Sequence, residues 1–145
     1  MSELHLLANK ERELFFREAA TELNIPFAII EKDFWVVWTL GQLFLIEELK
    51  THLTFKGGTS LSKVYGLIER FSEDIDVSIE KQFLGFGSPE KDPDKAVSSK
   101  KQRAALEELS KTCTEYVQND LLSALKKNIA KSLGTTEDWD LIPDE

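Results

Sequence analysis

The chain of 145 residues has little cysteine and little histidine: Cys113 is its single cysteine, and it has two histidines. A lone cysteine excludes an internal disulfide framework and fits a reducing compartment, so we expect a cytoplasmic protein. No apolar run approaches the roughly 20 residues that span a bilayer, and the N-terminus does not read as a signal peptide. His5 and His52 have no partners at metal-ligand spacing, and they predict neither a metal site nor a catalytic base.

Basic residues are also scarce. Eighteen lysines and arginines stand against 26 aspartates and glutamates, for a formal net charge of −8. A surface that coats nucleic acid non-specifically needs many Lys and Arg contacts to phosphate, so this balance argues against that class and leaves only a local basic groove open. The last nine residues hold five acids and no base. We therefore expect residues 1–145 to be one domain, the N-terminal part of a longer protein with a further helical region.

The spacing of apolar residues predicts helices around a short sheet. Strict alternation of apolar and polar residues near position 75 predicts a strand with one buried face. Cys113 falls on the apolar stripe of the last helix, which predicts a small core residue. In chain order, the expected elements are helices over 9–23 and 26–49, a strand at 53–55, a helix over 59–69, a strand over 74–79, a loop over 83–98 and a long helix over 99–133 that ends at Gly134.

A glycine pair follows the first expected strand, in the stretch FKGGTSLSK at residues 55–63. Glycines let the backbone approach a ligand closely. The hydroxyl residues after them cap a helix, whose free N–H groups attract an anion. Lys63, one turn further on, can reach the same anion. The plain alternative is a turn with a helix cap, and the P-loop spacing is absent. The expected phosphate turn consists of Gly57, Gly58, Thr59 and Ser60.

Two aspartates lie on one face of the second expected strand. Asp74 and Asp76 are two residues apart, so their carboxylates point to the same side. Like charges at that distance repel unless a cation lies between them. Hard oxygen ligands favour Mg²⁺ or Mn²⁺, and Mg²⁺ is commonly held by one or two carboxylates together with substrate phosphates. The alternative is a solvated strand face.

The order of glycine pair, hydroxyl residue, helix and Asp-x-Asp strand resembles the nucleotidyltransferase superfamily typified by DNA polymerase beta. The string FKGGTSLSKVYGLIERFSEDIDVSI is similar to the AbiEii/AbiGii toxin family, and Glu31–Trp35 is similar to its upstream signature. The resemblance covers Glu31 to Ile79. It implies an α/β fold of the α+β kind, with a small mixed sheet and surrounding helices.

The resemblance also implies a chemistry. It makes Asp74 and Asp76 the metal ligands, with Mg²⁺ or Mn²⁺ as cofactor, and makes Lys56 and Lys63 candidates for steadying the triphosphate of an NTP. It implies transfer of a nucleotide to a cellular acceptor, either RNA such as tRNA or protein, by the toxin of a toxin–antitoxin or phage-defence pair with a cognate antitoxin. Arg70 and Ser72 match the family string without a role that we can derive.

One departure from the superfamily pattern concerns its usual third carboxylate, for which the chain has no matching motif. Asp138 and Asp140 are candidates by elimination only. Two other classes therefore stay open: a nucleotide- or antitoxin-binding module without turnover, and a phosphohydrolase. We expect residues 1–145 alone to be inactive or weakly active as a nucleotidyltransferase.

Overall fold

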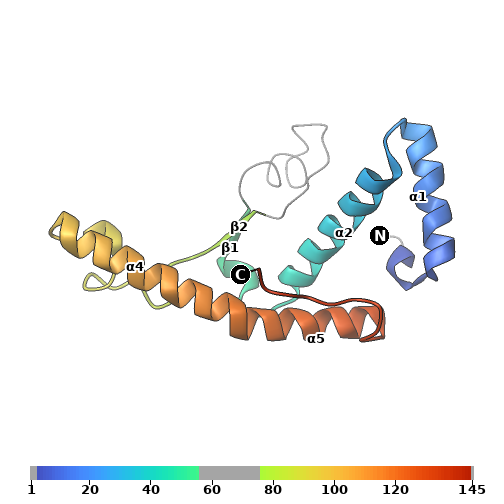
Figure 1. Ribbon diagram of the computed structural model, residues 1–145. Helices are drawn as coiled ribbons and strands as arrows, with labels where there is room; N and C mark the ends of the chain where they lie inside the picture. The colour runs from blue at the N-terminus through green and yellow to red at the C-terminus, as the bar shows by residue number, and fades with distance from the viewer. Residues whose placement is uncertain (1–2, 56–75, 145) are drawn as a thin grey trace.

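A computed structural model describes residues 3–55 and 76–144 (Figure 1). The helices α1 and α2 form an antiparallel pair at one end, and a long continuous helix runs beneath α2 and a small sheet. The described elements are 3₁₀ turns η1 (Glu3–Leu6), η2 (Lys50–His52) and η4 (Pro93–Lys95), helices α1 (Asn9–Leu23), α2 (Phe27–Phe44), α4 (Ser99–Tyr116) and α5 (Leu122–Leu133), the π-helical turn η5 (Val117–Leu121), and strands β1 (Leu53–Phe55) and β2 (Val77–Ile79).

The turn between α1 and α2 is set by local backbone chemistry. Asn24 takes the left-handed conformation with φ of 54°, and its N–H donates to carbonyls in the last turn of α1. Asparagine tolerates this conformation better than most residues. Pro26 precedes α2 with φ of −56°, close to the value its ring imposes. These two residues end α1 at Leu23 and begin α2 at Phe27, and the expected helix over 9–23 is confirmed.

The expectation that the second helix continues to residue 49 is wrong, because α2 ends at Phe44. The N–H groups of Leu45 and Ile46 donate three residues back, to Gln42 and Leu43, which tightens the chain into turns. Tighter turns place Ile46 and Leu49 against the core, where they are 5% and 0% exposed. The helical spacing of the sequence predicts a longer helix, but burial of these two side chains favours the tighter turns.

The hydrophobic core lies between α2 with its following turns and α5. Partly buried residues of both strands pack against it, among them Leu53, Val77 and Ile79. The fully buried cluster consists of Leu40, Leu43, Ile46, Leu49, Leu125 and Ile129.

The sheet has two antiparallel strands, with Leu53 opposite Ile79 and Phe55 opposite Val77. The expected strand at 53–55 is confirmed. Of the expected strand over 74–79, residues 77–79 form β2, while 74 and 75 lie outside the described residues, as does the expected helix over 59–69. The small sheet with helices around it agrees with the expected α/β class.

The long helix expected over 99–133 is confirmed as α4, η5 and α5 in continuous succession. Ser98 caps its start by accepting from the N–H of Lys101 at 3.2 Å, and Gly134 ends it with φ of 71°. Its apolar stripe is buried only in α5. In α4 and η5, Leu106 is 51% and Val117 39% exposed, and Cys113 is half-buried rather than a full core residue.

The loop between β2 and α4 is held by one buried carboxylate. Asp92, 5% exposed, accepts from Lys81 Nζ at 2.8 Å and from the N–H of Asp94 at 3.0 Å. Lys81 also pairs with the Asp94 carboxylate. The hydrogen bond from Lys81, followed by that from the Asp94 N–H, lowers the pKa of Asp92. A polar network thus orders a segment with few apolar residues.

We expect Leu49→Ala to lower the free energy of unfolding by about 2–5 kcal/mol, because it leaves a cavity at a fully buried position. The matched control is Leu45→Ala, since Leu45 is 57% exposed and its truncation should change stability by less than about 0.5 kcal/mol. Chemical denaturation measures both. Equal losses for the two variants would contradict the described packing.

We expect Lys81→Met to lower the thermal midpoint at neutral pH and to make its decline in acid shallower. Since the folded pKa of Asp92 lies below its unfolded value of 3.8, the stability it contributes is present above that pH and is lost as pH falls through the folded pKa. Without Lys81 the carboxylate loses the main cause of that shift. The control is Lys50→Met, which breaks the exposed pair with Glu47. Parallel acid profiles for wild type and Lys81→Met would contradict this linkage.

Candidate functional site

The strand register shows that the segment carrying the expected site leaves and re-enters the sheet at the same end of the two strands, which we call the sheet edge. Phe55 is the last residue of β1 and pairs with Val77, the first residue of β2. Asp76 stands directly before β2 and is exposed. The chain therefore leaves β1 and returns to β2 at the same edge, and the connecting segment 56–75 carries the rest of the expected motif.

Asp76 is the one expected site residue that the structure describes. The face of β2 that the sequence assigns to the core is confirmed by Val77 and Ile79, which pack against the buried cluster. The phosphate and metal roles stay predictions. Seven expected site residues lie outside the described residues: Lys56, Gly57, Gly58, Thr59, Ser60, Lys63 and Asp74.

The opposite end of the two strands is held by polar and aromatic contacts. The N–H of Glu80 donates to the carbonyl of His52 at 2.9 Å, and His52 Nδ1 lies 2.8 Å from Glu80 Oε2. The ring of Phe83 lies 5.1 Å from that of His52. These contacts extend the pairing beyond Ile79 and fix the sheet against the core, so Asp76 stands directly before a supported strand.

The two carboxylates considered for a third ligand lie in the segment after α5. Asp140 is 3.3 Å from Lys126 Nζ and accepts from the N–H of Leu141 at 2.7 Å. That backbone hydrogen bond, and then Lys126, lower the pKa of Asp140. Asp138 has φ of 64°. Among residues 3–55 and 76–144, no group of three or more His, Cys, Asp or Glu side chains is placed to hold a metal ion.

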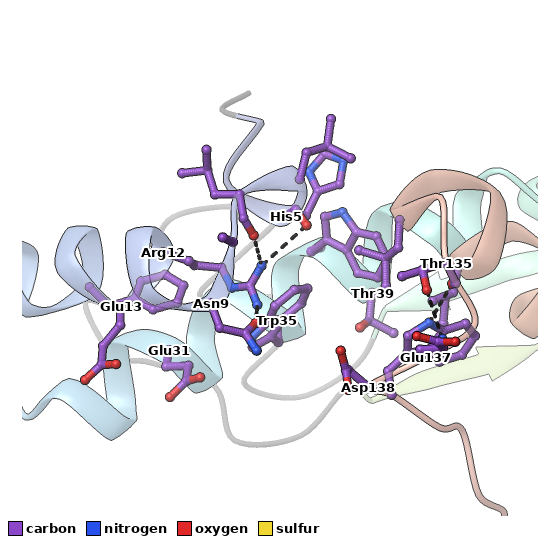
Figure 2. Close-up of a pocket in the computed structure, with 18 of the residues that line it drawn as sticks. His5, Asn9, Arg12, Glu13, Glu31, Trp35, Thr39, Thr135, Glu137 and Asp138 are labelled. Atoms are coloured by element: carbon purple, nitrogen blue, oxygen red, sulfur yellow. Dashed lines mark hydrogen bonds between the residues drawn. The ribbon is translucent and has the colours of Figure 1, made fainter.

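A second candidate site, whose lining includes no residue of β1 or β2, is a cavity of about 920 Å³ that we call the tryptophan pocket. It opens among η1, α1, α2, the end of α5 and the segment that folds back along α5 (Figures 1 and 2). All three tryptophans of the chain line it: Trp35, Trp38 and Trp139. A cavity of this size with aromatic walls and a few polar groups is typical of small-ligand sites.

Aromatic contacts hold the walls of the tryptophan pocket in place. Trp35 and Trp38 meet edge to face with ring centroids 5.5 Å apart, and His5 lies 5.6 Å from Trp38. On the opposite wall, Trp139 Nε1 donates to the carbonyl of Thr135 at 2.8 Å. The indoles are therefore fixed by neighbours that belong to different elements.

Sequence reasoning missed this pocket. The sequence placed Glu31, Trp35 and Trp38 within the expected helix over 26–49 and gave no sign that they line a cavity. They line a cavity because the segment around Trp139 folds back to complete it. No local motif joins residues from opposite ends of a chain, so the sequence carries no spacing signal for this site.

One known protein family matches most of this chain. Residues 38–141 match the family described as nucleotidyl transferase AbiEii toxin, type IV TA system. The chain belongs to the AbiEii family. No curated protein and no solved structure gives a significant match.

The AbiEii match confirms the resemblance drawn from the glycine pair and the aspartates. It also extends further than the 31–79 expected, because it includes the long helix and the segment up to residue 141. It starts at residue 38, after Glu31–Trp35, so that upstream signature is outside the matched range. None of the described helices is long and apolar enough to cross a membrane.

Proposed function

We propose that this AbiEii family member moves the nucleoside monophosphate of an NTP to a cellular acceptor, RNA such as tRNA or a protein, with Mg²⁺ or Mn²⁺ bound. The family gives the coarser class, a nucleotidyltransferase toxin of a type IV toxin–antitoxin system, and with it an antitoxin as partner. The observation that supports the finer proposal most directly is the pairing of Phe55 with Val77. It brings both ends of the motif-bearing segment to the sheet edge where Asp76 stands.

The donor set suits a hard divalent cation. Asp76 is exposed at the sheet edge, where a hydrated ion can approach it, and Asp74 is its expected partner on the strand. Two carboxylates plus substrate phosphate oxygens match the preferences of Mg²⁺ and Mn²⁺. When bound, the ion would lower the pKa of the attacking hydroxyl and neutralise charge on the leaving group.

The chain's own residues would position the reactants. The glycine turn would hold the β- and γ-phosphates by backbone N–H groups, with Lys56 and Lys63 neutralising their charge. The acceptor hydroxyl oxygen would then bond to the α-phosphorus, and the bond from that phosphorus to the bridging oxygen of the β-phosphate would break. Pyrophosphate leaves with the electron pair, and the hydroxyl proton passes to solvent. Positioning and charge stabilisation supply most of the rate in such phosphorus chemistry.

One incubation separates the three function classes. The full-length gene product is mixed with Mg²⁺, total RNA and NTPs that carry either an α- or a γ-phosphate label. Transfer of the α-label to RNA or to protein is the expected result, and it identifies the acceptor. Free phosphate without labelled acceptor would indicate a phosphohydrolase. Retained NTP without any product would indicate a binding module and would overturn the proposal.

We expect Asp76→Asn to lower nucleotide transfer by about 10²–10³-fold, because it removes a charge positioned for the metal. The unfolding free energy should change by less than about 0.5 kcal/mol, since Asp76 is exposed. Transfer assays and chemical denaturation measure the two quantities.

The matched control for this variant is Asp144→Asn, at another exposed aspartate, which should change neither quantity. Transfer at the wild-type rate by Asp76→Asn would show that Asp76 does not take part in the proposed site. A large loss of stability would show that its carboxylate has a structural role.

A further inference from the structure

The tryptophan pocket has a charge that the proposed nucleotide chemistry does not use. Five carboxylates line it, against one arginine and no lysine among the lining residues. Glu13 is paired with Arg17 at 2.6 Å, and Asp140 with Lys126 at 3.3 Å. The other three have no ion-pair partner among residues 3–55 and 76–144: Glu31, Glu137 and Asp138.

Arg12, the arginine of the pocket, is already engaged. Its guanidinium donates to the carbonyl of Leu7 at 2.9 Å and to Asn9 Oδ1 at 2.5 Å. It also lies over the ring of Trp35, 5.0 Å from the centroid. Arg12 also donates to the carbonyl of His5 in η1 at 3.4 Å, so its contacts tie η1 to α1 and leave it poorly placed to neutralise the three carboxylates.

The unpaired carboxylates stand on two sides of the aromatic wall. Figure 2 shows Glu31 on one side of Trp35 and Thr39, and Glu137 with Asp138 on the other. Glu31 comes from α2, while the other two come from the segment that follows α5. A cleft lined by charges of one sign concentrates its field on the space between them. The pocket therefore attracts a cation and repels phosphate.

The aromatic walls fit the same kind of ligand. Indole faces attract ammonium and guanidinium groups, and tryptophan does so best among the aromatic residues. They also cover the apolar stem of such a group. Arg12 over Trp35 shows that this wall already accepts a guanidinium.

We propose that the tryptophan pocket is a binding site for an organic cation, an ammonium or guanidinium carried on an apolar stem. The carboxylates of Glu31, Glu137 and Asp138 attract the charge from two sides, and the indoles contact the stem. The ligand can be a free amine or a lysine or arginine side chain of a peptide, since both present the same group. The lining includes Asp138 and Asp140, the two candidates for a third carboxylate, but it shares no residue with the expected phosphate turn or with Asp74 and Asp76.

The chain offers a direct readout, because its only three tryptophans all line this pocket. Intrinsic tryptophan fluorescence is titrated with spermidine, with agmatine and with Nα-acetyl-arginine amide, at ionic strength held constant with NaCl. The first two probes test the free-amine source, and the third tests the peptide source. ATP without metal is the anionic comparison.

The expected result is a saturable fluorescence change with at least one cationic probe and none with ATP. Glu31→Gln combined with Asp138→Asn should weaken binding about tenfold, since each exposed charge pair is worth about 2–5-fold. Asparagine tolerates the left-handed backbone of residue 138. Glu137→Gln is a second variant with a smaller expected effect, and circular dichroism checks that each variant folds.

Glu107→Gln combined with Asp120→Asn is the matched control, because it removes the same charge at exposed positions of α4 and η5 outside the pocket lining. It should bind as wild type does. No saturable change with any cation, equal weakening by the control, or binding of ATP as tight as that of the cations would each overturn the proposal. Asp76→Asn should bind the cation normally, so failure here is distinguishable from failure of the proposed transferase site.

Discussion

The contact between α2 and α5 depends on one buried polar residue. Gln42 is 6% exposed and lies in the last turn of α2, beside the buried Leu40 and Leu43. Its Oε1 accepts from Ser132 Oγ at 2.8 Å, and its carbonyl accepts from Asn128 Nδ2 at 3.5 Å. A buried amide oxygen without a partner is costly. The side chain of Gln42 is therefore satisfied only when α5 lies in one register along α2, which fixes both sites described above.

That register positions the sheet and the pocket together. The core between α2 and α5 supports Val77 and Ile79, and through them the strand that presents Asp76. The same α5 ends at Gly134, whose left-handed conformation turns the following segment back toward α2. This return adds Trp139 to the lining that Trp35 and Trp38 begin, and it completes the pocket.

Local features of the sequence predicted local features of the structure. Asn24 and Pro26 mark the break between two helices, and Gly134 marks the end of the long helix. The end of α2 was not predictable, because burial of Ile46 and Leu49 against α5 decides it. The glycine pair and the aspartates were visible because they lie close together in the chain, whereas the tryptophan pocket joins residues from its two ends. The exposure of the apolar stripe of α4 was likewise not predictable, since periodicity identifies an apolar helix face but does not show whether other residues cover it.

The expected phosphate turn and the tryptophan pocket differ in the sign of the charges beside them. The expected phosphate turn is flanked by Lys56 and Lys63, in a chain whose net charge is −8. The tryptophan pocket has three carboxylates without ion partners among the described residues, and its arginine is engaged with His5 of η1 and with Trp35. A triphosphate near that pocket would be repelled by these carboxylates. The acidic pocket thus disfavours a misplaced NTP, whereas Lys56 and Lys63 would favour phosphate at the proposed turn.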